Sequence, residues 1–343
     1  MLIKEKIIVL RFSAMGDVAM VACVLKEFSR QNPKTEIIMV SRGAFQPFFE
    51  GIENLTFHAI QPKTTHKGIF GLFKLYKELQ SYKPTAVADL HDNLRSRIVS
   101  TFFRFTGIKI DRIDKGRAEK KALTRSVNKI FKPLRQTVER YADVFRALGF
   151  KVELSHKLNQ KPQIIPEKAK HLFANELKKK IGISPFAQHI YKVYPTAKME
   201  KVIADLSKSG YEIFIFGGGK QEQEKAEKWA KTFPNTYSLI SQYNLLEELA
   251  LISNLDVMLS MDSSGMHMAS LVGVPVVSIW GPTHPYAGFL GYGQSESNCV
   301  QIEHPSRPNS IYGNKPCLCG VESCMDIIDP QTIVNKIKEN LNG

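Results

Sequence analysis

A carboxylate at the start of the first helical pattern is the first residue that could do chemistry. Asp17 ends the string Ser13-Ala14-Met15-Gly16-Asp17, which follows an apolar run and opens a stretch of helical periodicity. The loop amides and the helix dipole favour negative charge at this point, so Asp17 would stay ionised. An ionised carboxylate suits a reaction in which a hydroxyl surrenders its proton late, with Asp17 as general base. A helix-terminal carboxylate with a stabilising role only is the alternative.

Three glycines in Gly217-Gly218-Gly219-Lys220 follow an apolar run and precede a polar helical stretch. Glycine permits tight turning and close approach of the backbone to a ligand. Glu222 lies just beyond and could accept hydrogen bonds from ribose hydroxyls. The spacing fits neither the dinucleotide fingerprint nor the phosphate loop, so an ordinary strand-to-helix turn is the alternative.

The string Met261-Asp262-Ser263-Ser264-Gly265-Met266-His267 brings small hydroxyl residues directly from an apolar run into a helix. Ser263, Ser264 and the amides of the first turn could hold a pyrophosphate, and His267 could donate one hydrogen bond. Asp262 could order the loop or contact a sugar hydroxyl. A plain serine-capped helix is the alternative.

Alternating strands and helices must position these residues. The first half predicts strands over residues 6–11, 37–40, 55–60, 85–90 and 108–111, with helices over 17–30, 69–81, 94–105 and 135–148. The second half predicts strands over 181–187, 211–216, 255–260 and 274–280, with helices over 197–209, 221–232, 245–253, 264–271 and 330–341. This alternation predicts parallel sheets.

The polar stretch 151–168, which contains Pro162 and Pro166, is the predicted linker. We therefore expect two doubly wound α/β domains, residues 1–160 and 161–343, facing a central cleft. The last helix, about 330–342, is expected to pack back on the first domain.

The net charge of +14 favours an anionic partner, and the positive residues are dense between Arg95 and Arg146. Nucleic acid, anionic lipid and phosphorylated substrates all qualify. No segment reaches the roughly 18 apolar residues of a membrane span, so we expect a cytoplasmic or peripheral protein. The helix near 67–82 could insert apolar side chains into a membrane surface. An amphipathic helix that faces the protein core explains its apolar pattern more simply.

Cysteines cluster near the C-terminus. Cys317, Cys319 and Cys324 could supply part of the ligand set of a metal site. Cys23 lies in an apolar helical pattern typical of a core position.

Several strings in order resemble one known family: 8–17, Asp89-Leu90-His91-Asp92-Asn93-Leu94-Arg95-Ser96, Lys192-Val193-Tyr194-Pro195, the triglycine turn, 262–267 and 273–285. The chain resembles the heptosyltransferases of glycosyltransferase family 9 along its whole length. It departs from the family at Ser264, where glycine is common, and at Tyr194, where tryptophan is common. Many relatives also carry cysteines in the stretch that corresponds to Ser306–Asn309, and their absence argues against a structural metal site.

The resemblance implies a GT-B fold, an ADP-heptose donor in the C-terminal domain, and an anionic glycolipid acceptor of the Kdo-lipid A type in the N-terminal domain. It also implies inversion without a metal ion or other cofactor. Asp17 corresponds to the base and Lys192 to the cation that neutralises the leaving diphosphate. The donor site would comprise Gly218, Glu222, Asp262, Ser263, Ser264, Gly265 and His267. The acceptor site would comprise Ser13, Gly16, Asn93, Arg95, Arg117 and Arg140.

Two other functions remain open. The same fold could use another nucleotide-sugar donor or epimerise a nucleotide sugar. A protein that binds nucleic acid or another anionic polymer without turnover would also explain the basic composition, although we expect no nucleic-acid partner. The expected location is the cytoplasm, at the inner face of the inner membrane.

Overall fold

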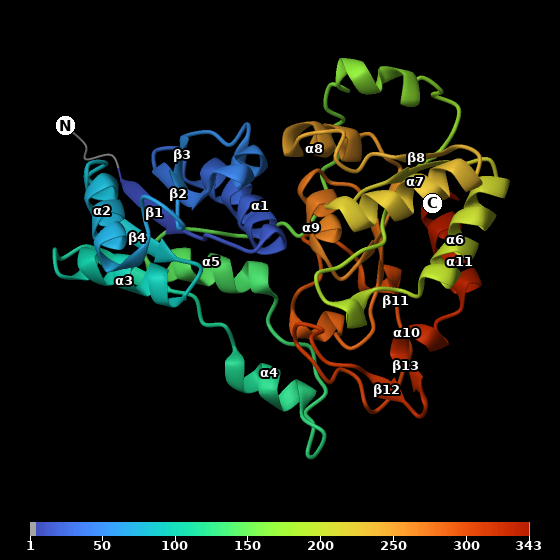
Figure 1. Cartoon of the computed structure of the whole chain (residues 1–343). Coiled ribbons are helices and arrows are strands. Elements are labelled where there is room, and N and C mark those ends of the chain that lie inside the picture. The colour runs from blue at the N-terminus through green and yellow to red at the C-terminus, as the bar shows by residue number, and fades with distance from the viewer. Residues whose placement is uncertain (1–4, 343) are drawn as a thin grey trace. The chain divides into compact units, whose positions relative to one another are not determined.

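The computed structural model describes residues 5–342 and divides the chain into two compact units, each a parallel sheet with helices on both faces (Figure 1). Unit 1 comprises the chain up to Lys115 together with Arg135–Ser155. Unit 2 comprises Gly116–Leu134 and the chain from His156 onward. The predicted class, two doubly wound α/β folds, is confirmed.

Unit 1 is built on a five-stranded parallel sheet of order β3-β2-β1-β4-β5. Its strands are β1 (Lys6–Leu10), β2 (Glu36–Arg42), β3 (Leu55–Ile60), β4 (Ala86–Asp89) and β5 (Lys109–Arg112). Its helices are α1 (Met15–Gln31), α2 (Gly68–Gln80), α3 (Leu94–Arg104) and α5 (Thr137–Ala147), with the 3-10 helix η1 (Gly43–Phe49). The central strand β1 is buried on both faces, as its unbroken apolar run predicts.

Unit 2 is built on a six-stranded parallel sheet of order β11-β10-β9-β6-β7-β8. Its sheet strands are β6 (Lys180–Ser184), β7 (Glu212–Ile215), β8 (Thr236–Ser238), β9 (Val257–Met261), β10 (Val276–Ile279) and β11 (Cys299–Val300). Its helices are α4 (Arg117–Thr124), α6 (Thr196–Lys208), α7 (Lys220–Thr232), α8 (Leu245–Ser253), α9 (Ser264–Leu271), α10 (Cys324–Ile327) and α11 (Pro330–Asn342). Short 3-10 helices are η2 (Glu167–Leu172), η3 (Ile190–Lys192), η4 (Pro285–Ala287) and η5 (Glu296–Asn298), and β12 (Leu318–Cys319) pairs with β13 (Glu322–Ser323) in an antiparallel hairpin.

The segment Gly116–Leu134 packs with unit 2 although its sequence neighbours belong to unit 1. Leu123 and Leu134 are buried with Ala287 in a small apolar cluster. The Lys120 amine lies 4.3 Å from the centre of the Phe289 ring. Lys129 donates to the backbone carbonyls of Pro305, Arg307 and Pro308 at 2.8, 3.0 and 3.1 Å. Apolar burial and these hydrogen bonds together attach the segment to unit 2.

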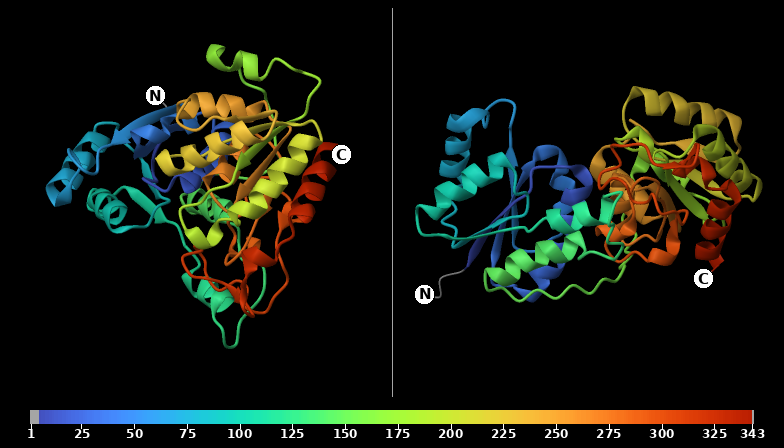
Figure 2. Two further views of the ribbon diagram at one scale, coloured as in Figure 1. Left: turned by 45° about the vertical axis from the view of Figure 1, so that its right-hand side comes forward. Right: turned by 90° about the horizontal axis from the view of Figure 1, so that it is seen from below.

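Helix α11 lies beside α6 in both sets of views (Figure 1, Figure 2). Its apolar face completes the core of unit 2. Ile333, Val334 and Ile337 are buried in the same cluster as the residues of β6, β9 and β10.

Helix α2 turns an apolar face to the core of unit 1, where Leu72, Leu75 and Leu79 are buried. Its opposite side is also apolar: Ile69, Phe70 and Phe73 are 53%, 88% and 46% exposed. Within residues 5–342, no helix has the length and apolar character needed to cross a membrane.

Candidate active site

Asp17 lies in the first turn of α1, directly after the loop that follows β1. Its carboxylate forms a 2.6 Å ion pair with Arg11 and accepts a hydrogen bond from the Ala14 amide at 3.3 Å. The hydroxyl of Tyr141, on α5, donates to the other carboxylate oxygen at 3.5 Å. The Asp17 side chain remains 26% exposed. A carboxylate that is held by three partners and is still partly exposed to solvent can accept a proton from a bound hydroxyl.

The two partners of Asp17 are fixed by burial. Burial raises the pKa of Tyr141, so its hydroxyl keeps its proton and remains a donor. Burial alone would lower the pKa of Arg11, but the Asp17 carboxylate opposes burial and the pKa is raised. Arg11 also donates to the carbonyl of Leu90 at 2.8 Å, which ties the Asp17 loop to the loop after β4.

The loop after β4 is hydrogen-bonded to the loop that precedes Asp17. His91 accepts a hydrogen bond from the Phe12 amide at 3.2 Å, and burial together with Arg11 lowers its pKa to about 3. The imidazole is therefore neutral at physiological pH. Asp89 is fully buried and accepts from the amides of His91 and Asp92. His91 is thus a support of the loop that the sequence reasoning did not place in the site.

The predicted acceptor residues occupy different environments. Ser13, in the loop before α1, and Gly16, in the first turn of α1, have intermediate exposure. Arg95 is exposed at the start of α3. Asn93 caps α3, because its side chain accepts the Ser96 amide at 2.9 Å. Arg140 is 6% exposed and donates to the carbonyl of Asp114 at 3.3 Å.

Arg117 is the one predicted acceptor residue outside unit 1. It begins α4 and is exposed on unit 2. The other five lie in unit 1.

Lys192 and Asp262 meet in unit 2. The Lys192 amine lies 3.1 Å from the Asp262 carboxylate, and the two side chains are only 14% and 9% exposed. Lys192 ends η3, in the loop between β6 and α6, and Asp262 directly follows β9. Both positions are at the carboxyl ends of neighbouring parallel strands, where sheets of this class bind ligands. A shielded ammonium group here can neutralise a diphosphate.

Helix α9 begins at Ser264, two residues after Asp262. Ser263 is its N-cap residue in extended conformation, and no side-chain capping bond engages its hydroxyl. Gly265 packs against β6 so closely that a β-carbon would overlap the Ser184 hydroxyl and lie 3.1 Å from that of Ser260. His267 lies two residues after Gly265 and is 6% exposed. The structure therefore brings the amides of Ser264 and Gly265 and the ammonium group of Lys192 into one region suited to an anion.

The triglycine turn connects β7 to α7. Glu222 points back over the turn and accepts the Gly218 amide at 2.8 Å. A β-carbon on Gly218 would meet nothing within 4 Å, so the space beside it is open. Gly219 has a φ of +87°, which favours glycine. The open space and the turned-back carboxylate are compatible with a ribose at this point.

Gly313 contacts Lys192, and it is not among the site residues expected from the sequence. A β-carbon there would overlap the aliphatic stem of Lys192, and its φ is +72°. Gly313 therefore lets the loop between β11 and β12 pack on Lys192. The signal available in the sequence was the turn string Gly313-Asn314-Lys315-Pro316, which lies far along the chain from Lys192.

Comparison with known proteins decides the family. The sequence model of glycosyltransferase family 9 (heptosyltransferase) matches residues 72–313. The chain belongs to this family. It is 25% identical over 294 residues to the lipopolysaccharide core heptosyltransferase OpsX of Haemophilus influenzae, covering 82% of this chain and 80% of the relative.

Solved structures agree on the fold. The family 9 glycosyltransferase of Veillonella parvula superimposes with a TM-score of 0.74 at 18% identity, covering 100% of this chain and 98% of that one. The Escherichia coli heptosyltransferase WaaC with ADP gives 0.68 at 18% identity, covering 98% and 99%. The protein is thus a glycosyltransferase of the heptosyltransferase family with the fold of those enzymes.

Proposed function

We propose that this family 9 glycosyltransferase transfers heptose from ADP-heptose to a lipopolysaccharide inner-core acceptor of the Kdo-lipid A type, with inversion and without a metal ion. The observation that carries the proposal is the Lys192–Asp262 pair at the N-terminus of α9. The matched curated relative acts on the lipopolysaccharide core by name, and one structural neighbour was solved with ADP.

The proposed reaction is a single displacement. The acceptor oxygen attacks the anomeric carbon of the heptose, and the bond from that carbon to the ADP oxygen breaks. The acceptor proton moves to the Asp17 carboxylate. ADP departs with its new negative charge next to the Lys192 ammonium group and the α9 amides. Attack from the face opposite the leaving group inverts the anomeric centre.

We propose that the transfer reaction needs no metal ion because of the side chains and amides present in the donor site. Divalent cations that bind diphosphates are usually held by carboxylates, and the sequence contains no Asp-x-Asp string. Lys192 provides positive charge, and the α9 amides provide donors in fixed positions. These groups together can do what a bound cation would do for the leaving group.

The remaining site residues are assigned either to the donor or to the acceptor. Gly218 and Glu222 are proposed to hold the ribose, and Asp262, Ser263, Ser264, Gly265 and His267 the donor sugar and pyrophosphate. Ser13, Gly16, Asn93, Arg95, Arg117 and Arg140 are proposed for the acceptor. Of these, Arg95 and Arg117 are exposed, as contact with a phosphate or acidic sugar requires.

The test of the donor is calorimetric titration with ADP, UDP and GDP in the presence of a chelator. Selective ADP binding is expected, and Lys192→Ala should weaken it by about tenfold to a hundredfold, since a charge-assisted hydrogen bond contributes about 1.5–3 kcal/mol. Lys201→Ala removes one exposed lysine from α6 and should change nothing. Preference for UDP or GDP, or binding that requires a divalent cation, would refute the assignment.

We further propose that unit 1 contacts the cytoplasmic face of an anionic membrane through α2. Exposed Phe70 and Ile69 lie on the same helix as Lys74 and Lys77, which are also exposed. Apolar side chains flanked by lysines bind anionic lipid surfaces. Such contact would place the protein where a glycolipid acceptor lies.

Vesicle co-sedimentation tests this contact. Phe70→Ser should reduce binding to vesicles containing anionic phospholipid by about tenfold to a hundredfold, since a phenyl ring withdrawn from lipid loses about 1.5–3 kcal/mol. Leu177→Ser, a control at a 97% exposed residue of unit 2, should leave binding unchanged. Equal binding by the Phe70 variant and the native protein would exclude α2 as the contact.

A further inference from the structure

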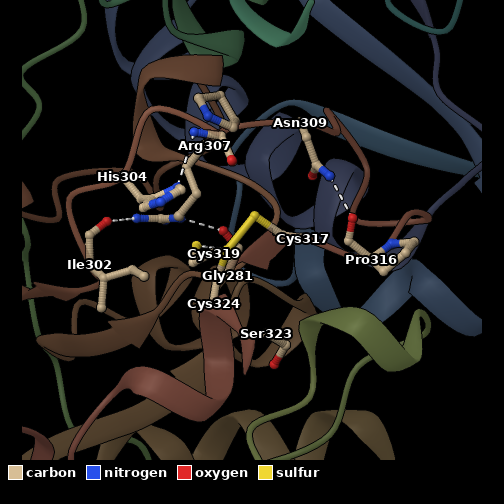
Figure 3. Close-up of a disulfide and its surroundings, with 12 residues drawn as sticks. Gly281, Ile302, His304, Arg307, Asn309, Pro316, Cys317, Cys319, Ser323 and Cys324 are labelled. Carbon is tan, nitrogen blue, oxygen red and sulfur yellow. Dashed lines mark hydrogen bonds between the residues drawn. A yellow bond between two sulfur atoms is a disulfide. The ribbon is translucent and has the colours of Figure 1, made fainter. Parts of the chain in front are cut away.

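Three cysteine sulfurs gather at the hairpin formed by β12 and β13 (Figure 3). The sulfurs of Cys317, Cys319 and Cys324 all lie within 4.8 Å of one another. Cys317 and Cys324 form a disulfide and are 3% and 1% exposed. Cys319 has intermediate exposure, and its sulfur lies 3.1 Å from that of Cys324. A free thiol in contact with a disulfide sulfur is the arrangement that thiol–disulfide exchange requires.

Burial raises the pKa of the Cys319 thiol, whereas the positive charge of Arg307 favours its thiolate and opposes a bound cation. The buried Arg307 is 2% exposed and interacts electrostatically with Cys319. It donates to the carbonyls of Gly281 and Ile302, which fixes its position (Figure 3). Among the described residues, the group that could hold a metal ion here contains only the three cysteines, whereas structural sites usually have four ligands.

The cluster is connected to the Lys192 loop. A cavity of about 250 Å³ is lined by Tyr191, Val193 and Pro195 together with Cys317 and Cys324. Breaking the Cys317–Cys324 bond therefore changes the lining of a cavity to which the Lys192 loop also contributes.

Hydrogen bonds strengthen this connection. The hydroxyl of Tyr194 donates to the carbonyl of Ile328 at 2.8 Å, and Lys198 donates to the same carbonyl at 3.1 Å and to that of Asp326. These carbonyls lie in and just after α10, the helix that Cys324 begins. On the other side of the disulfide, Gly313 packs on Lys192 four residues before Cys317. The disulfide thus joins the two segments that hold Lys192.

We propose that Cys317, Cys319 and Cys324 form a thiol–disulfide exchange site whose state controls the diphosphate affinity of the Lys192 site. The inference rests on the proposed donor role of Lys192. With Cys317 bonded to Cys324, both supports of Lys192 are held together and the ammonium group is in place. When this bond opens, the loop around Gly313 separates from α10 and the diphosphate is bound less tightly.

The exchange is balanced within the cluster. The Cys319 thiolate attacks the sulfur of Cys324, the bond from Cys324 to Cys317 breaks, and Cys317 leaves with the electron pair and takes up the proton that Cys319 lost. No net oxidation occurs. Complete opening consumes two molecules of a low-molecular-weight thiol such as glutathione, which become one disulfide as both protein sulfurs become thiols. In a reducing compartment, disulfides of this kind are usually transient and redox-sensing.

The experiment compares protein equilibrated with glutathione disulfide and with reduced glutathione. Alkylation and peptide mapping should find Cys317 joined to Cys324 in the first sample, with a minor fraction of Cys319 joined to Cys324, and free thiols in the second. The affinity for ADP should fall by about fivefold or more on reduction. Hydrogen exchange in residues 190–196 should become faster on reduction, and this readout does not depend on ADP.

Variants separate the cluster from general redox effects. Cys319→Ser should keep the Cys317–Cys324 disulfide and the redox response but abolish the minor isomer. The double change Cys317→Ser and Cys319→Ser should fix the reduced behaviour in both samples. Cys299→Ser, at a thiol of unit 2 outside the cluster, should respond like the native protein.

Three results would overturn the inference: equal ADP affinity with equal hydrogen exchange in both samples, no disulfide under glutathione disulfide, or a stoichiometric metal ion bound by the three thiols. Absence of ADP binding in both samples would refute the proposed function instead. Peptide mapping and hydrogen exchange would then still decide whether the cluster exchanges and whether it alters the Lys192 loop.

Discussion

The Asp17 carboxylate lies between a guanidinium group and a phenol, and both of these partners are buried. Asp17→Asn keeps the size of the side chain but cannot take a proton. We expect the turnover number to fall by about 10²–10⁴-fold, the usual contribution of a general base, while ADP binds normally. Steady-state transfer assays and calorimetry measure the two quantities. Glu50→Gln, an exposed carboxylate of unit 1, is the control; transfer by Asp17→Asn at the native rate would remove Asp17 from the mechanism.

Gly218 offers a test of the donor site that does not disturb the fold. A β-carbon there meets no protein atom within 4 Å, so Gly218→Ala should leave the thermal midpoint unchanged. If a nucleotide approaches this backbone, the methyl group should weaken ADP binding by about tenfold, or ~1.4 kcal/mol. Gly210→Ala is the reciprocal control, because its space is also open but its φ is +85°. It should lose about 1 kcal/mol of stability and bind ADP normally; unchanged ADP affinity in Gly218→Ala would place the nucleotide elsewhere.

At the scale of elements, helices α3 and α8 begin with the same capping arrangement. Asn93 and Asn244 each accept the amide of the third helical residue, Ser96 or Glu247, at 2.9 and 3.0 Å. Replacing either asparagine by alanine should cost about 1 kcal/mol of stability. Only Asn93→Ala should also raise the KM for the acceptor, because only α3 belongs to the proposed acceptor site. Denaturant unfolding and transfer kinetics check the pair, and an unchanged acceptor KM in Asn93→Ala would reduce Asn93 to a helix cap.

The elements were predictable where periodicity was long. The helices from α5 to α11 with three or more turns, and the central strands β1, β6 and β9, lie within a few residues of their predicted positions. The short elements β8, β11, β12, β13 and α10 were not predicted, since two to four residues cannot show a period. The sequence of α4 shows a basic stretch and no clear apolar period, because its buried residues are only Lys120 and Leu123.

At the scale of the whole molecule, the segment Gly116–Leu134 lies in the sequence between the two parts of unit 1 but belongs to unit 2. Leu123 is fully buried in the cluster with Leu134 and Ala287. Leu123→Ala should destabilise unit 2 by about 2–5 kcal/mol through the cavity it leaves. Hydrogen exchange should accelerate in peptides of residues 156–342 and not in those of 5–115. Leu177→Ala, at an exposed residue of unit 2, should have no effect; equal acceleration in both sets of peptides would show that the segment does not belong to unit 2 alone.

The sequence alone determined the fold class, the order of the long elements, and the strings around Asp17, Lys192, Gly218 and Asp262. These features are local: apolar periodicity sets each element, and parallel strands carry their following loops to one edge of a sheet. The family resemblance rests on the same local strings, and the match of the family model to residues 72–313 confirms it.

Only the tertiary structure decided which distant residues meet. It paired Lys192 with Asp262, placed Gly313 on the stem of Lys192, and set Tyr141 and Arg11 around Asp17. It also assigned α11 and Gly116–Leu134 to unit 2. These contacts join residues that are mostly far apart in the chain, so no periodicity records them. They depend on which surfaces remain to be covered once each sheet has formed, and that is settled by packing.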